Sequence, residues 1–238
     1  MPVTGAWRAI LRHAGVEVVA RQPRNYPRLR RPLLMAEERI SLAIDVGANS
    51  GQWARELRDA GYRGRIVSFE PGAEAFAKLE IAAAGDQLWE CRRLAIGARA
   101  GTAPLHVSGN SVSSSLLRHS DRQLAAEPRS AVVSTETVEL RRLDELDGLA
   151  NADDRILLKA DVEGGELDVL AGAVGLLDRT RLLELELSAI ALHDHQPLLG
   201  EIVHWCEEAG FGLTGFEVSF RDRSTGDLFS GNGFFRRT

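Results

Sequence analysis

The sharpest chemical pattern in this sequence is a glycine-containing loop at residues 45–51, DVGANSG. It follows a short apolar run and precedes a stretch with helical periodicity, so we expect it to join a buried strand to a helix. Glycine lets the backbone turn tightly and approach a ligand closely, and the helix presents free N–H groups to a polar part of that ligand. The loop is therefore predicted to bind a small molecule through Asp45, Gly47, Ala48, Asn49 and Gly51.

A second acidic position, Glu70, stands at the end of the next apolar run and is followed by Pro71. A carboxylate there can accept two hydrogen bonds from a ribose diol, and the same logic serves nicotinamide cofactors. The loop lacks the G-x-G-x-x-G spacing of dinucleotide sites. Its D-x-G-x-x-x-G pattern instead resembles the first motif of methyltransferases, in which the acid steadies the loop and the cofactor's methionine end. The alternative for Glu70, taken on its own, is a solvated acid at a strand end.

Residues 159–166, KADVEGGE, place further carboxylates at the end of the fourth apolar run. Ligand crevices of open α/β sheets lie beyond the carboxyl ends of the strands, so we expect Asp161 and Glu163 at the site. Two carboxylates buried close together need a partner. Lys159, a cation and a substrate hydroxyl are the candidates. The alternative is that Glu163 and Glu166 are ordinary first-turn helix acids.

A fourth group consists of Glu184, Glu186 and the histidines of His193-Asp194-His195. The two glutamates share a face if their segment is extended, and two histidines at this spacing can share a metal or face a substrate. His193 is our first candidate for the general base, with Asp161 next, because imidazole is the usual proton acceptor near neutral pH. A surface role is the alternative. Asp161, Glu163 and Glu186 are the residues to test as ligands of a hard cation. A divalent metal is possible but not expected, because no tight metal motif is present.

Strands alternating with helices would position these residues. Apolar runs at 41–46, 65–70, 88–97, 155–162 and 181–188 alternate with amphipathic stretches at 52–61, 72–85, 165–177 and 197–210. Residues 211–218 and 227–237 predict a closing hairpin-like pair. Residues 102–108 predict an added strand, 137–146 a short strand into a turn, and the serine-rich stretch 108–135 has no clear periodicity. This order predicts an α/β, Rossmann-like fold with a mostly parallel seven-stranded sheet and helices on both faces.

Residues 1–39 are expected to form a helical, Arg-rich extension that acts as a lid or cap, and 40–238 the ligand-binding domain. Trp7, Ile10 and Leu11 recur at helical spacing, and a second short helix is expected at 35–39. Prolines at 23, 27 and 32 are predicted to interrupt regular structure. The arginines at 21, 24, 28, 30 and 31 predict a solvated connector, with a phosphate or anionic-lipid contact as the alternative.

Composition limits the partners and the cellular location expected for this protein. The formal net charge of −5 argues against a general nucleic-acid partner. Cys91 and Cys206 have no metal-ligand spacing and make no disulfide framework. With no long apolar segment, we expect a cytoplasmic protein with no transmembrane segment, for which peripheral membrane contact and homo-oligomerisation are possible.

Taken together, these motifs resemble the FkbM family of methyltransferases, from roughly Ile40 to Arg236. The segments that carry the resemblance are IDVGANSGQWARELRDAGYRGRIVSFEP, NSVSSSLL, LLKADVEGGELDVLAGA and LELS, with the helix ending EEAGF. The resemblance implies binding of S-adenosylmethionine and O-methylation. Relatives in the family commonly act on sugars, glycolipids or polyketide-type natural products.

The resemblance also assigns roles. Asp45, Gly47, Asn49 and Gly51 would form the cofactor loop, and Glu70 would hold the ribose. Ser113, Ser114 and Ser115 would line the site, with Asp161 and Glu163 near the transferred methyl. Many relatives have Gln at Glu163, an aromatic at Gly165, Tyr at His193 and Asp at Asn232. These departures surround the expected acceptor pocket.

The sequence thus predicts an S-adenosylmethionine-dependent O-methyltransferase acting on a hydroxyl of a small-molecule or glycan acceptor, most plausibly a sugar, a glycolipid or a related natural product. One alternative is an NAD(P)-dependent oxidoreductase. Such an enzyme needs a Tyr or Lys constellation at the site of hydride transfer. The only tyrosines, Tyr26 and Tyr62, do not follow a late core strand, so this alternative lacks support. Another is a non-catalytic protein that binds S-adenosylmethionine.

Overall fold

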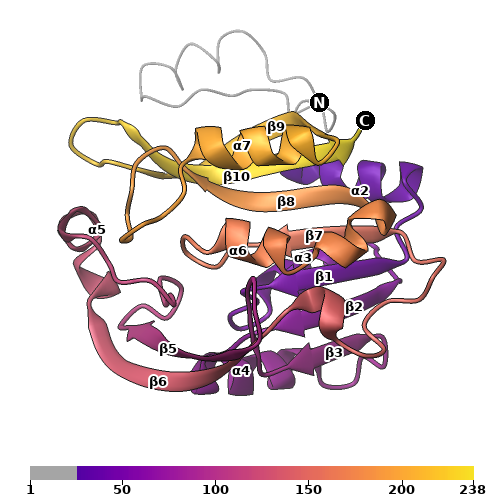
Figure 1. Ribbon diagram of the computed structural model, residues 1–238, viewed down its shortest axis with the longest axis horizontal. Coiled ribbons are helices and arrows are strands. Elements are labelled where there is room, and N and C mark those ends of the chain that lie inside the picture. The colour runs from indigo at the N-terminus through magenta and orange to yellow at the C-terminus, as the bar shows by residue number, and fades with distance from the viewer. Residues whose placement is uncertain (1–25) are drawn as a thin grey trace, which may run out of the picture.

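A seven-stranded sheet forms the centre of the computed structural model, which describes residues 26–238 (Figure 1). Its strand order is β3-β2-β1-β7-β8-β10-β9, and β10 alone runs in the direction opposite to the other strands. The strands are β1 (Leu42–Val46), β2 (Arg65–Phe69), β3 (Trp89–Arg92), β7 (Ile156–Ala160), β8 (Thr180–Ser188), β9 (Phe211–Arg221) and β10 (Leu228–Arg237). The mostly parallel sheet and the closing β9–β10 pair agree with the sequence prediction.

Helices cover both faces because side chains alternate along each strand. Leu42, Ile44 and Val46 of β1 pack in the cluster that contains apolar side chains of α6 and α7, whereas Ala43 packs in the cluster that contains those of α2 and α3. The helices are α2 (Pro27–Glu37), α3 (Gln52–Asp59), α4 (Ala73–Ala83), α5 (Asp121–Ala126), α6 (Glu166–Ala171) and α7 (Leu199–Glu208), with short 3₁₀ turns at Pro128–Ser130, Leu143–Glu145 and Val174–Arg179.

A second, three-stranded sheet extends from the central one, to the lower left in Figure 1. It contains β4 (Ala95–Ile96), β5 (Gly101–Ser108) and β6 (Val132–Arg141) in the order β4-β6-β5. β6 begins five residues before the strand predicted within 137–146 and ends at Arg141. The serine-rich stretch also contains α5, a helix too short to produce a periodic pattern, where the Ser120 side chain accepts a hydrogen bond from the N–H of Gln123.

The proline-rich approach to the core differs from the prediction. Pro27 and Pro32 lie within α2 instead of interrupting it. Pro27 occupies the first turn, where no intrahelical N–H bond is lost, and the apolar side chains of Leu34 and Met35 hold the helix against the core. Arg31 of α2 does not belong to a solvated connector, because it is 5% exposed and bonds to a buried glutamate, whereas Arg28 is exposed. The residues expected to form a first helix, and Arg21, Pro23 and Arg24, lie outside the described residues.

Over residues 26–238, no helix has the length and apolar character needed to cross a membrane. Both cysteines are free thiols, in agreement with the prediction of no disulfide framework.

Candidate active site

A row of charged side chains crosses the middle of the sheet just below its carboxyl edge. Asp45 of β1 lies beside Lys159 of β7, and Lys159 lies beside Glu184 of β8. The Lys159 ammonium is 3.1 Å from Asp45 Oδ1, and Arg31 of α2 donates a hydrogen bond of 2.7 Å to Glu184 Oε1. All four side chains are buried. Burial raises the pKa of Glu184, although the Arg31 guanidinium opposes that rise.

The loop after β1 lies directly above this row. Lys159 donates to the carbonyl oxygen of Gly47 at 2.7 Å. Gly47 has φ +75°, and a Cβ there would lie 1.9 Å from the Asp161 carbonyl oxygen, so only glycine fits between β1 and β7. Asn49 also has a positive φ, and its N–H donates to Glu70 Oε2 at 2.9 Å. Asp45 is fully buried and lines neither of the two cavities beside the loop; it supports the loop from beneath.

Glu70 closes the loop from the end of β2. Its Oε1 accepts the N–H of Gly72 at 2.8 Å, and its Oε2 accepts that of Asn49. Burial raises the pKa of this carboxyl, although the two N–H donors act to lower it. Each carboxylate oxygen has a further lone pair, and the side chain lines the main cavity, so Glu70 can still accept hydroxyl donors from a ligand.

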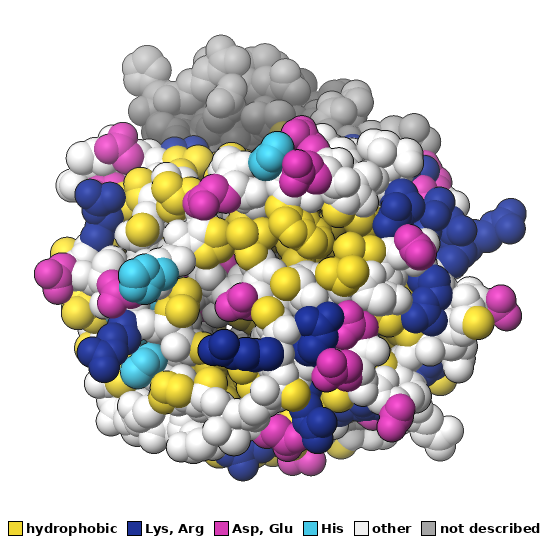
Figure 2. Space-filling view, viewed as in Figure 1, with side chains coloured by type: hydrophobic (Ala, Val, Ile, Leu, Met, Phe, Trp, Pro, Cys, Tyr) yellow, Lys and Arg dark blue, Asp and Glu magenta, His cyan; other side chains and the backbone are white. Residues whose placement is uncertain are grey.

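The main cavity has a volume of about 310 Å³, at the lower end of the ~300–1,000 Å³ usual for small-molecule sites. It opens near the middle of the face shown in Figure 2, where acidic and basic side chains meet at a hollow. Of the predicted site residues, its wall includes Gly47, Asn49, Glu70, Pro71, Ser114, Ser115, Asp161 and Glu163. Ala48, Gly51 and Ser113 are absent from this wall. Gly51, at φ +82°, begins α3.

A second cavity, of about 200 Å³, lies on the α2 side of the loop. It shares Gly47, Asn49, Val112 and Asp161 with the main cavity, so these residues form the junction between the two. Its own wall is polar for the most part and includes Arg28, Arg31, Gln52, Glu56, Lys159, Glu184 and Asn232, together with Ala48 and the aromatic Trp53.

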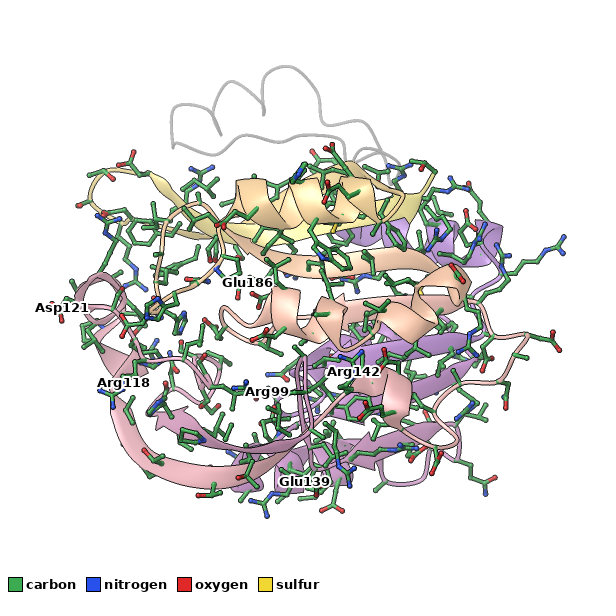
Figure 3. All side chains as sticks on the ribbon, viewed as in Figure 1. Arg99, Arg118, Asp121, Glu139, Arg142 and Glu186 are labelled. Carbon is green, nitrogen blue, oxygen red and sulfur yellow. The ribbon has the colours of Figure 1, made fainter. Side chains whose placement is uncertain are left out.

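Three carboxylates gather at the junction. One carboxylate oxygen from each of Asp161, Glu163 and Glu186 lies within 4.8 Å of the other two. Glu163 has φ +57°, a conformation that non-glycine residues rarely adopt. Burial and the neighbouring Asp161 raise the pKa of Glu163 well above its ordinary value; burial and Glu163 do the same for Glu186. Figure 3 shows Glu186 above, and Arg99 below, the turn that leads into α6.

Comparison with known proteins identifies the family to which this geometry belongs. The model of the methyltransferase FkbM domain matches residues 45–213. The chain belongs to the FkbM methyltransferase family. Among curated proteins, the 2-O-methyltransferase NoeI of Sinorhizobium fredii is 26% identical over 183 residues, which cover 74% of this chain and 75% of the relative.

The solved structures that are similar to this chain superpose on it only in part. An rRNA methylase from Streptococcus thermophilus has a TM-score of 0.49 at 11% identity, covering 92% of this chain and 99% of its own. Magnesium protoporphyrin IX methyltransferase from Synechocystis, with bound S-adenosylmethionine, has a TM-score of 0.48 at 13% identity, covering 87% and 75%. Both scores are below 0.5, so the family match and the strand order carry the assignment.

The family membership confirms two predictions made from the sequence: the class I methyltransferase fold and an S-adenosylmethionine-dependent methyltransferase activity. The nicotinamide-dependent alternative receives no support. The residues present fit the cofactor, because Gly47 and Glu70 line the cavity and the N-terminus of α3 has no side-chain cap.

His193 and His195 do not face a common site. His193 is 1% exposed and lines neither cavity, whereas His195 is exposed. His193 Nε2 is 3.9 Å from Glu163 Oε2, and neither ring nitrogen has a hydrogen bond of good geometry. Burial, and then the neighbouring His119, lower the pKa of His193 to about 4, so its imidazole is neutral at physiological pH. His193 therefore lies behind Glu163, away from the cavity surface.

Glu166 has a separate, structural role. Its Oε1 accepts the N–H groups of Val162 and Gly164, which fixes the turn between β7 and α6. Burial raises its pKa to about 7. This arrangement is close to the alternative of a first-turn helix acid.

The sequence reasoning missed one wall of the main cavity. It comes from the segment around β4 and from the second sheet, and includes Ile96, Gly97, Arg99, Leu105 and Leu140. A signal was available, because residues 94–97 follow the third strand of the sheet just as the loop and Glu70 follow the first two. The serine-rich stretch supplies another part of the wall, since Ser115 donates to the Glu163 carbonyl at 2.7 Å.

Proposed function

We propose that this chain transfers a methyl group from S-adenosylmethionine to a hydroxyl oxygen of a sugar, a glycolipid or a related polyhydroxylated compound. The observation that carries the proposal is the meeting of two unlike cavities at Asp161. One has an apolar wall and a ribose-binding candidate, and the other is lined mainly by hydrogen-bonding side chains. The name of the relative from Sinorhizobium, a 2-O-methyltransferase, agrees with an oxygen acceptor.

In this proposal, the cofactor occupies the main cavity. Glu70 accepts the ribose hydroxyls, and Ile96, Leu105 and Leu140 provide an apolar wall suited to a planar heterocycle. The uncapped N-terminus of α3 suits the anionic end of the methionine part. When bound, S-adenosylmethionine would supply an electrophilic methyl group to the acceptor oxygen, with S-adenosylhomocysteine and a proton as the other products.

The acceptor would enter through the second cavity. Arg28, Gln52, Glu56 and Asn232 offer donors and acceptors to several hydroxyl groups, and Trp53 offers a flat apolar surface. Because Asp161 lines both cavities, its carboxylate is the group best placed to accept a hydrogen bond from the reacting hydroxyl and to align that oxygen. Alignment accounts for much of the rate in such a transfer, since the methyl donor is already activated.

The choice of proton acceptor changes as a result. His193 ranked first from the sequence, yet it is buried behind Glu163 and lines neither cavity. We now propose Asp161 as the group that receives the hydroxyl proton. His193 would act as a positioning residue for Glu163.

The test is incubation of the full chain with S-adenosylmethionine carrying a labelled methyl and with fractionated oligosaccharides and glycolipids of the source cell. We expect label in a sugar ether, identified by mass spectrometry after hydrolysis. Label in protein, in RNA or on nitrogen would contradict the proposal. If calorimetry shows cofactor binding but no fraction accepts label, the non-catalytic alternative is favoured.

A further inference from the structure

The carboxylates of Asp161, Glu163 and Glu186 are three acids with too little positive charge near them. Within residues 26–238, no lysine or arginine forms an ion pair with Glu163 or Glu186. Lys159 reaches Asp161 at 3.8 Å but is closer to Asp45, at 3.1 Å. Carboxylates that are buried together are costly unless a proton or a cation compensates them.

A second, independent observation comes from His193, which reaches the cluster from the loop after β8. Its side chain is almost fully buried, and Nε2 faces Glu163 Oε2 from 3.9 Å. Gln196 lies beside the ring, but neither ring nitrogen has a hydrogen bond of good geometry. Buried polar atoms without a partner are rare, and leaving one unsatisfied is unfavourable. A buried imidazole that contacts a carboxylate from behind is the kind of outer partner that orients metal ligands in proteins.

We propose that Asp161, Glu163 and Glu186 bind one divalent cation of the Mg²⁺ or Mn²⁺ type, with His193 against Glu163 on the far side. The donors are mainly carboxylate oxygens, which hard cations prefer. Oxygens bound to one such ion at ~2.0–2.6 Å are separated by ~3–5 Å, and the three carboxylates already meet that spacing, within 4.8 Å. From the sequence, a divalent metal is possible but not expected, and the proposal departs from that prediction.

The position of the three carboxylates would let the cation take part in the reaction. Asp161 lines both cavities, so the cation lies where an acceptor hydroxyl would meet the cofactor. A divalent ion there lowers the pKa of a coordinated hydroxyl and holds a neighbouring oxygen as well. This role rests on the proposed O-methyl transfer. The binding of the cation does not, because the ligands belong to the chain itself.

The experiment titrates the full-length chain with Mn²⁺, without cofactor or acceptor, and follows free Mn²⁺ by electron paramagnetic resonance. We expect one ion per chain, displaced by Mg²⁺. Glu186→Gln keeps the size of the side chain and should weaken Mn²⁺ binding at least tenfold. His193→Ala should weaken it by about tenfold, the lower end of the range found for residues that support metal ligands, and by less than Glu186→Gln does. Asp168→Asn removes a carboxylate that lines the same cavity but lies outside the cluster, and should leave Mn²⁺ affinity unchanged.

A measurement on the wild-type chain keeps the test decisive if a variant fails to fold. Fe²⁺ takes the place of Mn²⁺, and peroxide with ascorbate then cuts the backbone close to the bound ion. We expect cuts near residues 161–163 and 186, suppressed by excess Mg²⁺. Three results would each overturn the proposal: no Mn²⁺ binding by the wild type, Mn²⁺ affinities of Glu186→Gln and His193→Ala equal to that of the wild type, or cuts confined to other segments. Since neither cofactor nor acceptor is present, failure here leaves methyl transfer untouched, and failure to find an acceptor leaves the metal result standing.

Discussion

Replacing Lys159 with methionine tests whether the charged row beneath the cofactor loop is as desolvated as its burial indicates. Lys159 is 6% exposed and Asp45 is fully buried. The ammonium lies 3.1 Å from Asp45 Oδ1 and also donates to the Gly47 carbonyl at 2.7 Å. Burial acts to lower the pKa of Lys159, but the Asp45 and Asp161 charges outweigh it and raise that pKa, so the side chain is charged at neutral pH.

Lys159→Met removes the positive partner and leaves the Asp45 carboxylate in the core. Breaking a buried ion pair on one side costs about 3–5 kcal/mol, because the remaining charge is uncompensated. For a domain of this size, that loss corresponds to a fall in Tm of about 6–20 °C. Urea titration and calorimetry at pH 7 would measure it. The double variant Lys159→Met/Asp45→Asn removes the stranded charge, so it should lose less than the sum of the two single variants, by about 1–3 kcal/mol.

The matched control is Lys78→Met. Lys78 makes an even shorter ion pair, 2.7 Å from Glu74 four residues away, but both side chains are exposed. Exposed pairs contribute little, so this variant should unfold almost as the wild type does. If Lys159→Met were no more destabilising than Lys78→Met, or if the double variant simply added the two single losses, the Asp45–Lys159 pair would not be desolvated and the reasoning would be wrong.

Three further predictions concern the cofactor, the proton acceptor and pH. Glu70→Ala should weaken S-adenosylmethionine binding by about 1–3 kcal/mol in calorimetry, the range for losing a charge-assisted hydrogen bond; an unchanged dissociation constant would remove Glu70 from the ribose site. Asp161→Asn should lower kcat by about 10²–10⁴-fold and His193→Ala by less, whereas the reverse order would restore the ranking made from the sequence. Although burial raises the pKa of Asp144, the Arg142 guanidinium lowers it further, to a net value below the ordinary one. Its contribution to stability is therefore present above the unfolded pKa of about 3.9 and is lost as pH falls through the lower folded value. The difference in unfolding free energy between wild type and Asp144→Asn should accordingly shrink below about pH 4, and a constant difference down to pH 2 would contradict the pKa shift.

Local patterns explain what was predictable. The alternation of apolar runs and amphipathic stretches depends on neighbours within one element, so it fixed the α/β class and most strands to within a few residues. The rule that ligands lie at the carboxyl ends of parallel strands identified the loop at 45–51, Glu70 and Asp161 before any contact was known. Helix α5 and the full length of β6 escaped because neither has a repeated apolar face.

The sequence by itself determined the family, the glycine-containing loop at 45–51 and the carboxylates at the strand ends, because glycine positions and strand periodicity are written in consecutive residues. Only the tertiary structure decided which of these side chains share an environment. Arg31 bonds to Glu184, Lys159 binds Asp45 more closely than Asp161, and His193 is buried behind Glu163. Such pairings follow from the order of strands in the sheet and from the left-handed backbone of Glu163, and these bring together residues far apart in the chain.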